Sequence, residues 1–438
     1  MFNYYCALAL RSLRRNVVLT ALMIAAIGVG IAASMTTLTV YRSMAANPIP
    51  GKSQQLWAVQ IDNWGVGGGV GPGGGDNLQD QLSYTDATGL MNTHGARRQV
   101  AMYASIAIVT PADPQVRPFQ LVARATYGDF FPMFNVPFRF GAGWSAADDD
   151  ARAAVVVISS DLNDRLFGGA NSVGKMIHLQ TEDYRVVGVL DRWEPVPRFY
   201  DLDGAYSKPE DLFLPFRRAI EQRLAADAGD SNCSRSVGKG WEGFLFSDCV
   251  WIQFWAELPT DADVRRYRSL LTNYAAEQQR AGRFHWAPRT QLRDVQQWLS
   301  YHHLVSDEVR IMVLVSLSFL AVCLLNATGL MLAKIVSRAA DIGVRRALGA
   351  SRRAIFVQCL IETAVVGLVG GLLGLLLTGL GLKGLGLLIS EEGRLLLHLD
   401  AMDVAIAILL AVTVTVIAGL YPTWRAARLQ PALQLKSL

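Results

Sequence analysis

Histidine and cysteine are scarce in this chain, with six histidines and five cysteines among 438 residues. Zinc sites need three or four such ligands at characteristic spacings. Only His302 and His303 lie next to each other, and no HExxH or mixed cysteine and histidine pattern occurs. Asp148–Asp150 lacks the ligand spacing of an EF-hand and predicts a solvated turn. The sequence therefore predicts no metal site.

Complete nucleotide-binding and catalytic motifs are also missing. Gly169–Lys175 matches the start of a Walker A motif, but Met176 stands where a hydroxyl residue would hold magnesium. Gly69, Gly71 and Gly74 form a GxGxxG that no amphipathic helix pattern follows. There is no GxSxG elbow, no pair of carboxylates stands out as catalytic, and there is no compact basic domain. We expect no enzyme activity, no bound cofactor and no nucleic-acid partner for this chain.

Charged residues are few, at 18% against 51% apolar residues, and they are unevenly distributed. Four stretches are nearly free of charge, and each approaches the roughly 20 residues that cross a bilayer. Only Glu362 is charged within the apolar stretches 17–41, 311–333, 355–382 and 404–420. We predict membrane helices over 17–41, 307–333, 355–382 and 404–421. The fold class is therefore four membrane helices, one before and three after a large extracytoplasmic domain at 42–306.

Basic residues beside the spans set the orientation, because cytoplasmic flanks retain lysine and arginine. Arg11, Arg14 and Arg15 precede the first span, six basic residues lie in 334–354, and three more follow the fourth span. These flanks are predicted to be cytoplasmic: an amphipathic helix at 1–16, the loop 334–354 and the tail 422–438. A short outer loop occupies 383–403. The first apolar run has about 24 residues, whereas the apolar region of a cleaved signal peptide has 7–15 residues. We therefore expect a membrane anchor.

The outer domain shows mixed periodicities that predict an α+β module of two subdomains. Alternating patterns predict strands at 55–62, 102–110, 153–158 and 184–190, and helical spacing appears at 159–167, 211–226 and 264–280. Helical spacing from Leu292 toward Val309 predicts a stalk that continues into the second span. Cys233 and Cys249 form one possible disulfide, with two buried free thiols as the alternative.

Two features stand out inside the spans. Gly367, Gly370, Gly371 and Gly374 form overlapping GxxxG pairs, which allow close helix approach within this subunit or to a second one. Glu362 lies near the cytoplasmic edge, where Arg352, Arg353 or lipid head groups are expected to hold it. A structural tether is favoured over a proton relay, because no second ionisable residue lies well inside a span.

The basic loop carries a resemblance to a known family. Ser337–Ala350, which contains Asp-Ile-Gly-Val-Arg-Arg-Ala-Leu-Gly-Ala, resembles the cytoplasmic loop of FtsX-like permeases, above all the MacB type of ABC transporter. Tyr421–Pro431 resembles the family's ending, although Leu433 replaces its usual acid. Segments of the outer domain, from Gly128-Asp-Phe-Phe to Val187-Gly-Val, are similar to the MacB periplasmic core domain. Residues 191–255 match less closely, and we expect specificity for substrate or partner there.

The resemblance implies a multi-pass permease of the bacterial inner membrane with a large periplasmic domain. It implies a separate ABC ATPase subunit that binds ATP and magnesium, since MacB carries its ATPase within one polypeptide and only a short segment precedes the first span here. It also implies a second permease subunit, identical or paralogous, contacts with membrane lipid, and a periplasmic adaptor with an outer-membrane channel. The residues expected to couple to the ATPase are Arg338, Asp341, Gly343, Arg345, Arg346, Gly349, Arg352 and Arg353.

Several functions are compatible with this family. The leading hypothesis is export of a substrate from the periplasm by mechanotransmission, in which ATP-driven movement reaches the outer domain without a solute path through the lipid. An alternative is lipoprotein extraction in the manner of LolC and LolE. Another is regulation of a cell-wall hydrolase, as in FtsX, whose outer domain is smaller, or coupling to peptide sensing, as in BceB-type proteins, which have more spans. An anchored receptor would leave the basic loop unexplained.

Overall fold

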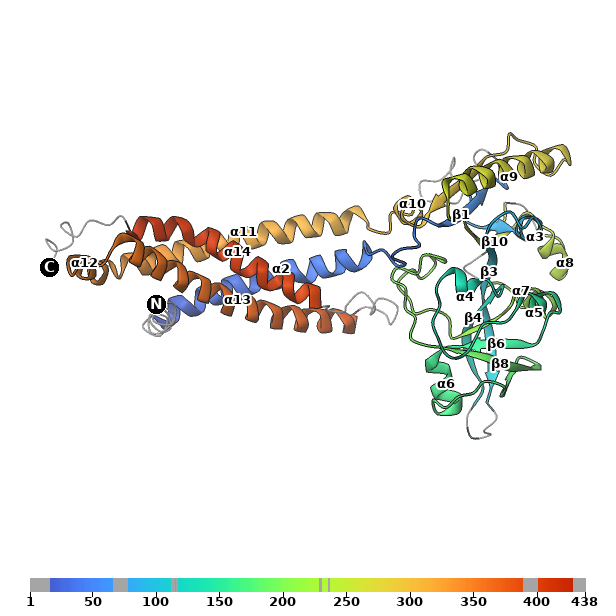
Figure 1. Cartoon of the computed structure of the whole chain (residues 1–438), viewed down its shortest axis with the longest axis horizontal. Coiled ribbons are helices and arrows are strands. Elements are labelled where there is room, and N and C mark those ends of the chain that lie inside the picture. The colour runs from blue at the N-terminus through green and yellow to red at the C-terminus, as the bar shows by residue number, and fades with distance from the viewer. Residues whose placement is uncertain are drawn as a thin grey trace. The chain divides into compact units, whose positions relative to one another are not determined.

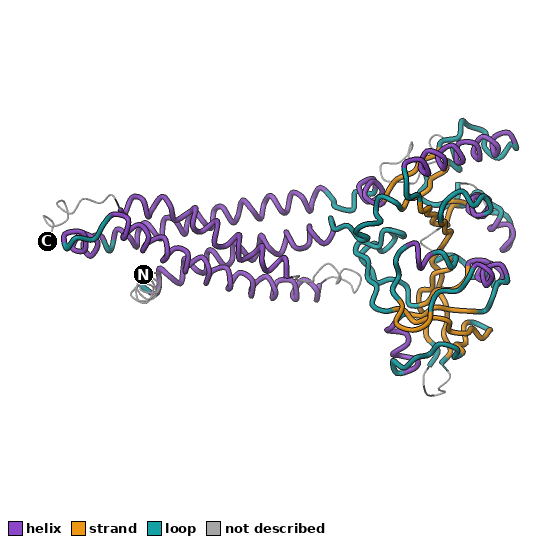
Figure 2. The backbone as a smooth tube through the Cα atoms, viewed as in Figure 1, coloured by secondary structure: helices purple, strands orange, loops and turns teal. Residues whose placement is uncertain are grey.

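The computed structural model describes residues 16–65, 78–111, 115, 117–227, 231–234, 237–388 and 401–427. The chain divides into two compact units (Figures 1 and 2). The first, which we call the helix bundle, comprises the residues up to Ala45 and those from Val305 onward, and the second, the outer domain, is Ala46–Leu304. The predicted helix at 1–16, the glycine motif at 69–74 and most of 383–403 and 422–438 lie outside the described residues, wholly or in part.

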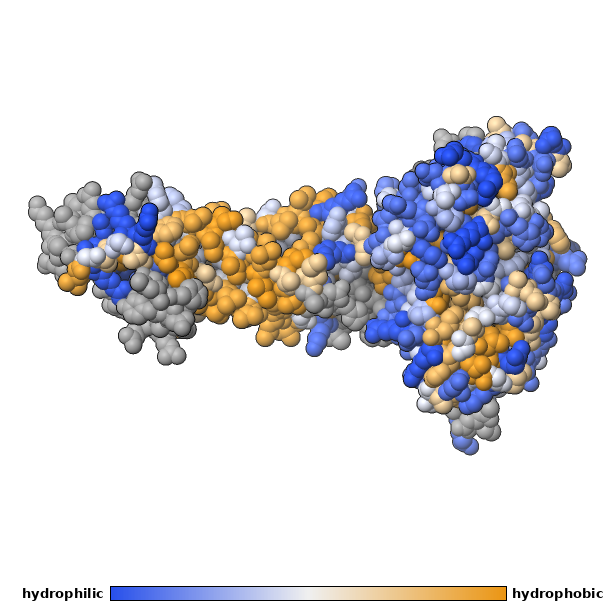
Figure 3. Space-filling model, in the orientation of Figure 1, coloured by the Kyte–Doolittle hydropathy of each residue, from blue (hydrophilic) through white to orange (hydrophobic). Residues whose placement is uncertain are grey.

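The helix bundle contains four helices that are long and apolar enough to cross a membrane. The prediction of one span before and three after the outer domain is confirmed. A short helix links the second and third spans, and Figure 3 shows an apolar surface along the long helices that gives way to hydrophilic residues near it. The bundle helices are α2 (Val17–Met44), α11 (Asp307–Val336), α12 (Ala339–Ala347), α13 (Arg352–Leu388) and α14 (Ala401–Ala427).

Glycines of α13 lie against two neighbouring helices. A Cβ atom added at Gly370 or Gly374 would come within 2.8 Å of Ile27 or Ile31 on α2. At Gly371 it would lie 2.6 Å from the Cβ of Ala411 on α14. Small residues let helix backbones approach where lipid gives no hydrophobic drive for association. The overlapping GxxxG pairs therefore line interfaces within this chain.

Eleven strands of the described residues form the sheet of the outer domain, with most strands in the order β11-β1-β10-β3-β4-β9-β6-β8-β5. Strand β2 pairs with β10, and β7 pairs with β3 and β8. The long strand β3 pairs with β10 through 98–102 and with β4 through 103–109, so it joins the two strand groups. The strands are β1 (Leu56–Ile61), β2 (Leu82–Ser83), β3 (Arg98–Thr110), β4 (Phe119–Thr126), β5 (Phe138–Gly141), β6 (Val155–Ile158), β7 (Met176–Leu179), β8 (Glu182–Leu190), β9 (Leu212–Pro215), β10 (Val250–Glu257) and β11 (Thr290–Asp294).

Short helices surround this sheet, and the longest is α9. It begins with a reciprocal capping box between Thr260 and Asp263 and buries Val264, Tyr267 and Leu271 on one face, as its spacing predicts. The capping and the apolar stripe together explain why this segment is helical. The helices are α3 (Tyr84–Met91), α4 (Phe130–Met133), α5 (Ala146–Asp150), α6 (Ser160–Phe167), α7 (Phe216–Glu221), α8 (Gly240–Leu245), α9 (Asp261–Arg280) and α10 (Val295–Tyr301).

Two predicted helices are wrong in part. The segment 211–226 begins with strand β9, whose residues are all buried between β4 and β6, and only 216–221 is helical. Pairing with distant strands overrides the local helical spacing there. The predicted continuous stalk is also interrupted: residues 290–294 form β11, α10 ends at Tyr301, and His303 has a left-handed φ of 48° before α11 begins.

The acidic run at 148–150 is the end of helix α5, and the predicted solvated turn is wrong for its middle residue. Asp149 is buried and accepts hydrogen bonds from the Gly128 amide and the Trp144 indole, both at 2.8 Å. Burial raises the pKa of Asp149 to about 7, although these two bonds oppose the shift. This carboxyl group ties α5 to the loop before α4.

A buried cluster of charges fixes the segment that follows β8. Arg124 on β4 forms ion pairs with Asp201 and Glu210, and Glu210 also accepts from Arg198 at 3.2 Å and from the Tyr200 hydroxyl at 3.0 Å. Two guanidinium groups thus face two carboxylates. Because each buried charge has an opposite partner and hydrogen bonds, the segment is held in one arrangement on the sheet.

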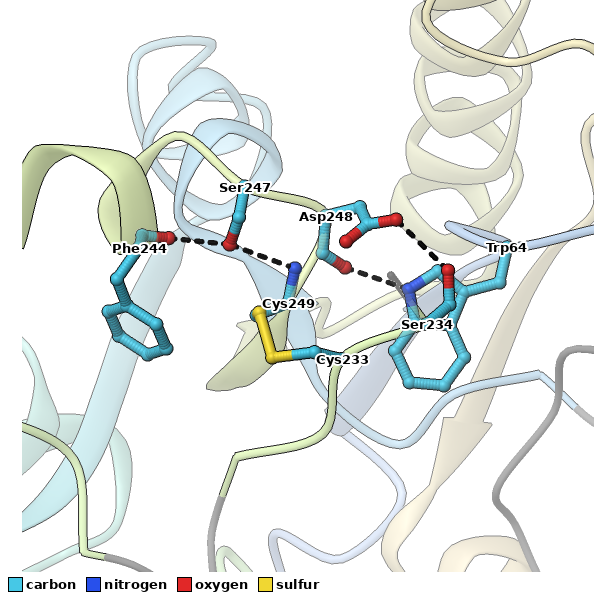
Figure 4. Close-up of a disulfide and its surroundings, with 7 residues drawn as sticks. All are labelled: Trp64, Cys233, Ser234, Phe244, Ser247, Asp248 and Cys249. Atoms are coloured by element: carbon cyan, nitrogen blue, oxygen red, sulfur yellow. Dashed lines mark hydrogen bonds between the residues drawn. A yellow bond between two sulfur atoms is a disulfide. The ribbon is translucent and has the colours of Figure 1, made fainter. Parts of the chain in front are cut away.

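The cysteine pair lies near the start of β10. Cys233 and Cys249 are joined by a disulfide, as Figure 4 shows. Next to it, the Asp248 carbonyl accepts from the Trp64 indole at 2.7 Å, and the Ser234 hydroxyl bonds the Asp248 carboxylate at 3.0 Å. The disulfide and these bonds hold residues 231–234 against β10.

Candidate functional site

The basic loop between the second and third spans is a helix and a turn. Arg338 is the N-cap of α12, and the helix carries Asp341, Gly343, Arg345 and Arg346. Gly349 has a φ of 97°, a backbone conformation that favours glycine, and the Ala350 amide bonds back to the Arg345 carbonyl at 3.0 Å. This turn reverses the chain, so that α13 begins at Arg352.

One part of this segment is exposed and carries both charge and apolar surface. Arg345, Arg352 and Arg353 are exposed, and Val344 and Leu348 are 52% and 84% exposed. Protein interfaces combine apolar contact with arginine in this way. Gly343 and Arg346 are half-buried, and the side chain of Asp341 lies outside what the structure describes.

The other part of the segment turns into the bundle. Glu362 on α13 lies 2.5 Å from the Lys334 ammonium and 3.5 Å from the Arg338 guanidinium. The Lys334 side chain is 4% exposed and also bonds the Thr20 hydroxyl on α2 at 3.4 Å. We call Lys334, Arg338 and Glu362 the bundle charge cluster. It connects the end of α11 to α13.

Glu362 is thus held, but by partners other than those expected. Arg352 and Arg353 lie about ten residues before it on the same helix, which corresponds to about 15 Å along the axis. The end of α11 supplies Lys334 instead, and this side chain reaches Glu362 across the bundle although α11 and α13 each pack mainly against α2 and α14. Sequence reasoning missed this role, although a lysine at the end of an otherwise uncharged span was a usable signal.

A second polar contact ties α12 to α13. The Arg345 guanidinium donates to the Gln358 side-chain oxygen at 3.2 Å. Gln358 precedes Glu362 by one helical turn, so both contacts of the basic segment fall on neighbouring turns of α13. Gln358 therefore links α12 to α13, and the bundle charge cluster links the start of α12 to both α13 and α11.

Comparison with known proteins agrees with this arrangement. The family model described as "MacB-like periplasmic core domain" matches residues 20–273, which is more than half of the chain, and that described as "FtsX-like permease C-terminal" matches 313–431. Four membrane-spanning helices around such a domain define an ABC transporter permease with a periplasmic domain. The chain belongs to the MacB-like family of FtsX-like permeases.

Several curated relatives are similar over nearly the whole chain. The protein named "Macrolide export ATP-binding/permease protein MacB" from Syntrophobacter fumaroxidans is 24% identical and aligns with 98% of this chain and 63% of its own length. Its namesake from Escherichia coli O157:H7 is 25% identical, with 98% and 60% covered. This chain spans between 41% and 63% of the length of the relatives that it matches best.

A solved structure is also similar to the outer domain. The crystal structure of the periplasmic region of MacB from Actinobacillus actinomycetemcomitans shares 13% identity and covers 57% of this chain and 94% of its own, with a TM-score of 0.37. That score is too low to establish a common fold by itself. Membership of the family rests on the two sequence matches.

Proposed function

We propose that this chain is the permease subunit of a mechanotransmission ABC transporter of the bacterial inner membrane. In this proposal a separate ATPase subunit binds ATP and magnesium and docks on the exposed face of α12 and the start of α13. Its movement reaches α11 and α13 through the Arg345–Gln358 contact and the bundle charge cluster. Two permease subunits, identical or paralogous, work together.

The observation that carries this proposal is the two-sided build of the basic segment. It presents Arg352 and Arg353 beside exposed Val344 and Leu348, while Arg338 and Arg345 bond to side chains of α13. Retention of the loop by the membrane potential alone would require positive charge but neither exposed apolar residues nor bonds into the bundle. A partner protein that binds the exposed residues would explain the apolar surface. A linkage to the membrane helices would explain the bonds to α13.

The transported substrate is proposed from the names of related proteins, and not from a substrate-binding site in the structure. Relatives carry the names of macrolide and pyoverdine exporters, so we propose export of a small molecule from the periplasm, with a periplasmic adaptor and an outer-membrane channel as partners. Lipoprotein extraction and hydrolase regulation remain the alternatives, and no contact within the described residues favours either.

Charge reversal on α12 tests the docking. Gly343→Glu with Arg345→Glu should lower stimulation of the partner ATPase, co-purified with the permease, by about tenfold or more, because like charges across an interface repel. Membrane insertion should be unchanged, as measured by the yield of protein in washed membranes. The matched control is Arg268→Glu on the exposed face of α9.

The control should leave ATPase stimulation within about twofold of the unaltered protein, because surface substitutions away from an interface have small effects. Docking on α12 is wrong if the double variant stimulates the ATPase as well as the control does. It is also wrong if labelling from outside the cell reaches a cysteine placed at Arg352, since the basic segment would then lie on the other side of the membrane.

A further inference from the structure

A cavity of about 200 Å³ lies inside the helix bundle, beside the bundle charge cluster. The long helices α2, α11, α13 and α14 and the short helix α12 all contribute to its wall. Its lining divides into an apolar end and a charged end. The apolar end includes Met23, Ile27, Leu324, Ala327, Met331 and Val366, and the charged end includes Lys334, Arg338, Arg345, Gln358 and Glu362.

The cavity is elongated along the helices. Leu324 and Lys334 lie ten residues apart on α11, which corresponds to about 15 Å along its axis. Its volume would take about seven groups of the size of a water molecule, at roughly 30 Å³ each. This is room for the first part of one acyl chain, with the rest of a lipid left in the bilayer.

The charged end carries more positive than negative charge. Among the lining residues there are three cations, Lys334, Arg338 and Arg345, and one carboxylate, Glu362. Arg338 lies 3.5 Å from the same carboxylate as Lys334, and Arg345 donates to the Gln358 side-chain oxygen at 3.2 Å. Arg345 is exposed, so this end can be reached from outside the bundle. Guanidinium groups match the geometry of phosphate oxygens, and basic pockets between membrane helices on the cytoplasmic side suit anionic head groups.

We propose that this cavity binds one anionic phospholipid of the cytoplasmic leaflet. Arg338 and Arg345 hold its phosphate group, and one acyl chain occupies the apolar end, which Ala418 on α14 also lines. A zwitterionic lipid offers the same chain without net negative charge, so the head group provides the selectivity. The binding does not depend on an ATPase, and its test is separate from the test of docking.

Native mass spectrometry of the full chain in detergent measures the binding directly. Phosphatidylglycerol should be retained at one molecule per chain, about tenfold or more tightly than phosphatidylcholine, because a hydrogen-bonded charge pair is worth at least one tenfold step. Arg338→Gln with Arg345→Gln should reduce retention of phosphatidylglycerol by a similar factor. The matched control, Arg352→Gln with Arg353→Gln, removes the same charge from exposed residues that do not line the cavity and should change retention by less than about twofold.

A second variant probes the apolar end without changing charge. Ala418→Phe fills the place of the acyl chain and should weaken retention of both lipids. In the unaltered protein, phosphatidylglycerol with a photoreactive acyl chain should label the 324–331 segment of α11, a readout that needs no variant.

Four results would overturn the proposal. The two lipids could be retained equally, or the control could lose phosphatidylglycerol as fully as the cavity variant does. Millimolar inorganic phosphate could displace the lipid, which would make the site one for a free anion. Photolabelling could also miss α11, which would place the lipid elsewhere.

Discussion

Both units of this protein bury a carboxylate between two basic side chains, but the two clusters differ in their number of carboxylates. In the outer domain Glu210 lies between Arg124 and Arg198, and Asp201 provides a second carboxylate. In the bundle charge cluster, Glu362 is the one carboxylate that the described side chains place beside Lys334 and Arg338. The outer cluster is balanced in charge, whereas the bundle charge cluster has one positive charge in excess.

The difference follows from what each cluster does. A cluster that is balanced in charge specifies one arrangement, because separating any member leaves a buried charge without its partner. An unbalanced cluster at a helix end is less costly to rearrange, since long cationic side chains can reach water or lipid head groups. The outer cluster fixes a fold, while the bundle charge cluster suits the transmission of movement and the anion binding that we propose.

The sharpest test of this comparison is removal of the outer carboxylate. Glu210→Gln should lower the free energy of unfolding of the outer domain by about 3–5 kcal/mol, because two buried guanidinium groups then share one carboxylate. Urea unfolding of the full chain, followed by tryptophan fluorescence, measures it. Asp161→Asn is the control, since its pair with Lys208 at 3.0 Å is exposed and should be worth at most about 1 kcal/mol.

Acid provides a second readout of the same substitution. Burial alone would raise the pKa of Glu210, but Arg124 and Arg198 outweigh it and hold the pKa at about 2, below the ordinary 4.5. Between these pH values the unfolded state binds more protons, so the stabilisation is complete above pH 4.5 and is lost as the pH falls toward 2. Glu210→Gln should lack this part of the acid dependence. An unchanged acid dependence would show that Glu210 is not held by the two arginines.

The comparison also shows what the sequence could predict. The four spans, the basic segment and helix α9 follow from local composition and spacing, because each depends on hydrophobic periodicity or charge within one stretch. Strand β9 does not, since Leu212–Pro215 is a strand only by pairing with β4 and β6, which lie far away in the chain. A buried carboxylate such as Asp149 is equally hidden, because its indole and amide partners come from other segments.

Some features of the candidate site were also predictable from the sequence, and others were not. Its arginines were predictable from the orientation rule and from the family resemblance. The inward contacts were not: the pairing of Glu362 with Lys334 depends on how α11 and α13 both pack against α2 and α14, which no local pattern encodes. The distinction between exposed arginines and the inward-facing Arg338 emerges only from the packing of the loop against the bundle.

Helix packing gives a second, smaller test. Gly371→Leu should lower the unfolding free energy of the bundle by about 1–3 kcal/mol, because the new side chain has no room against Ala411 on α14. A thiol-reactive dye measures bundle unfolding through Cys323 and Cys359 in a Cys6→Ser background. Gly329→Leu is the matched control, since an added Cβ there meets nothing within 4 Å. Equal destabilisation by both variants would mean that the glycines do not mark an interface.

The smallest effect is expected for the bundle charge cluster itself. Glu362→Gln keeps a hydrogen-bond acceptor for Lys334 but removes the negative charge, and we expect a cost on the order of 1 kcal/mol in the same dye assay. Lys334 lies in the last turn of α11, where the helix dipole favours a cation, so its charge remains partly compensated. Adding Lys334→Met should recover most of the loss, because the excess charge then falls. If Glu362→Gln lowered the unfolding free energy as much as Glu210→Gln does, the two clusters would not differ. The bundle charge cluster would then fix its helices as firmly as the outer cluster fixes its segment.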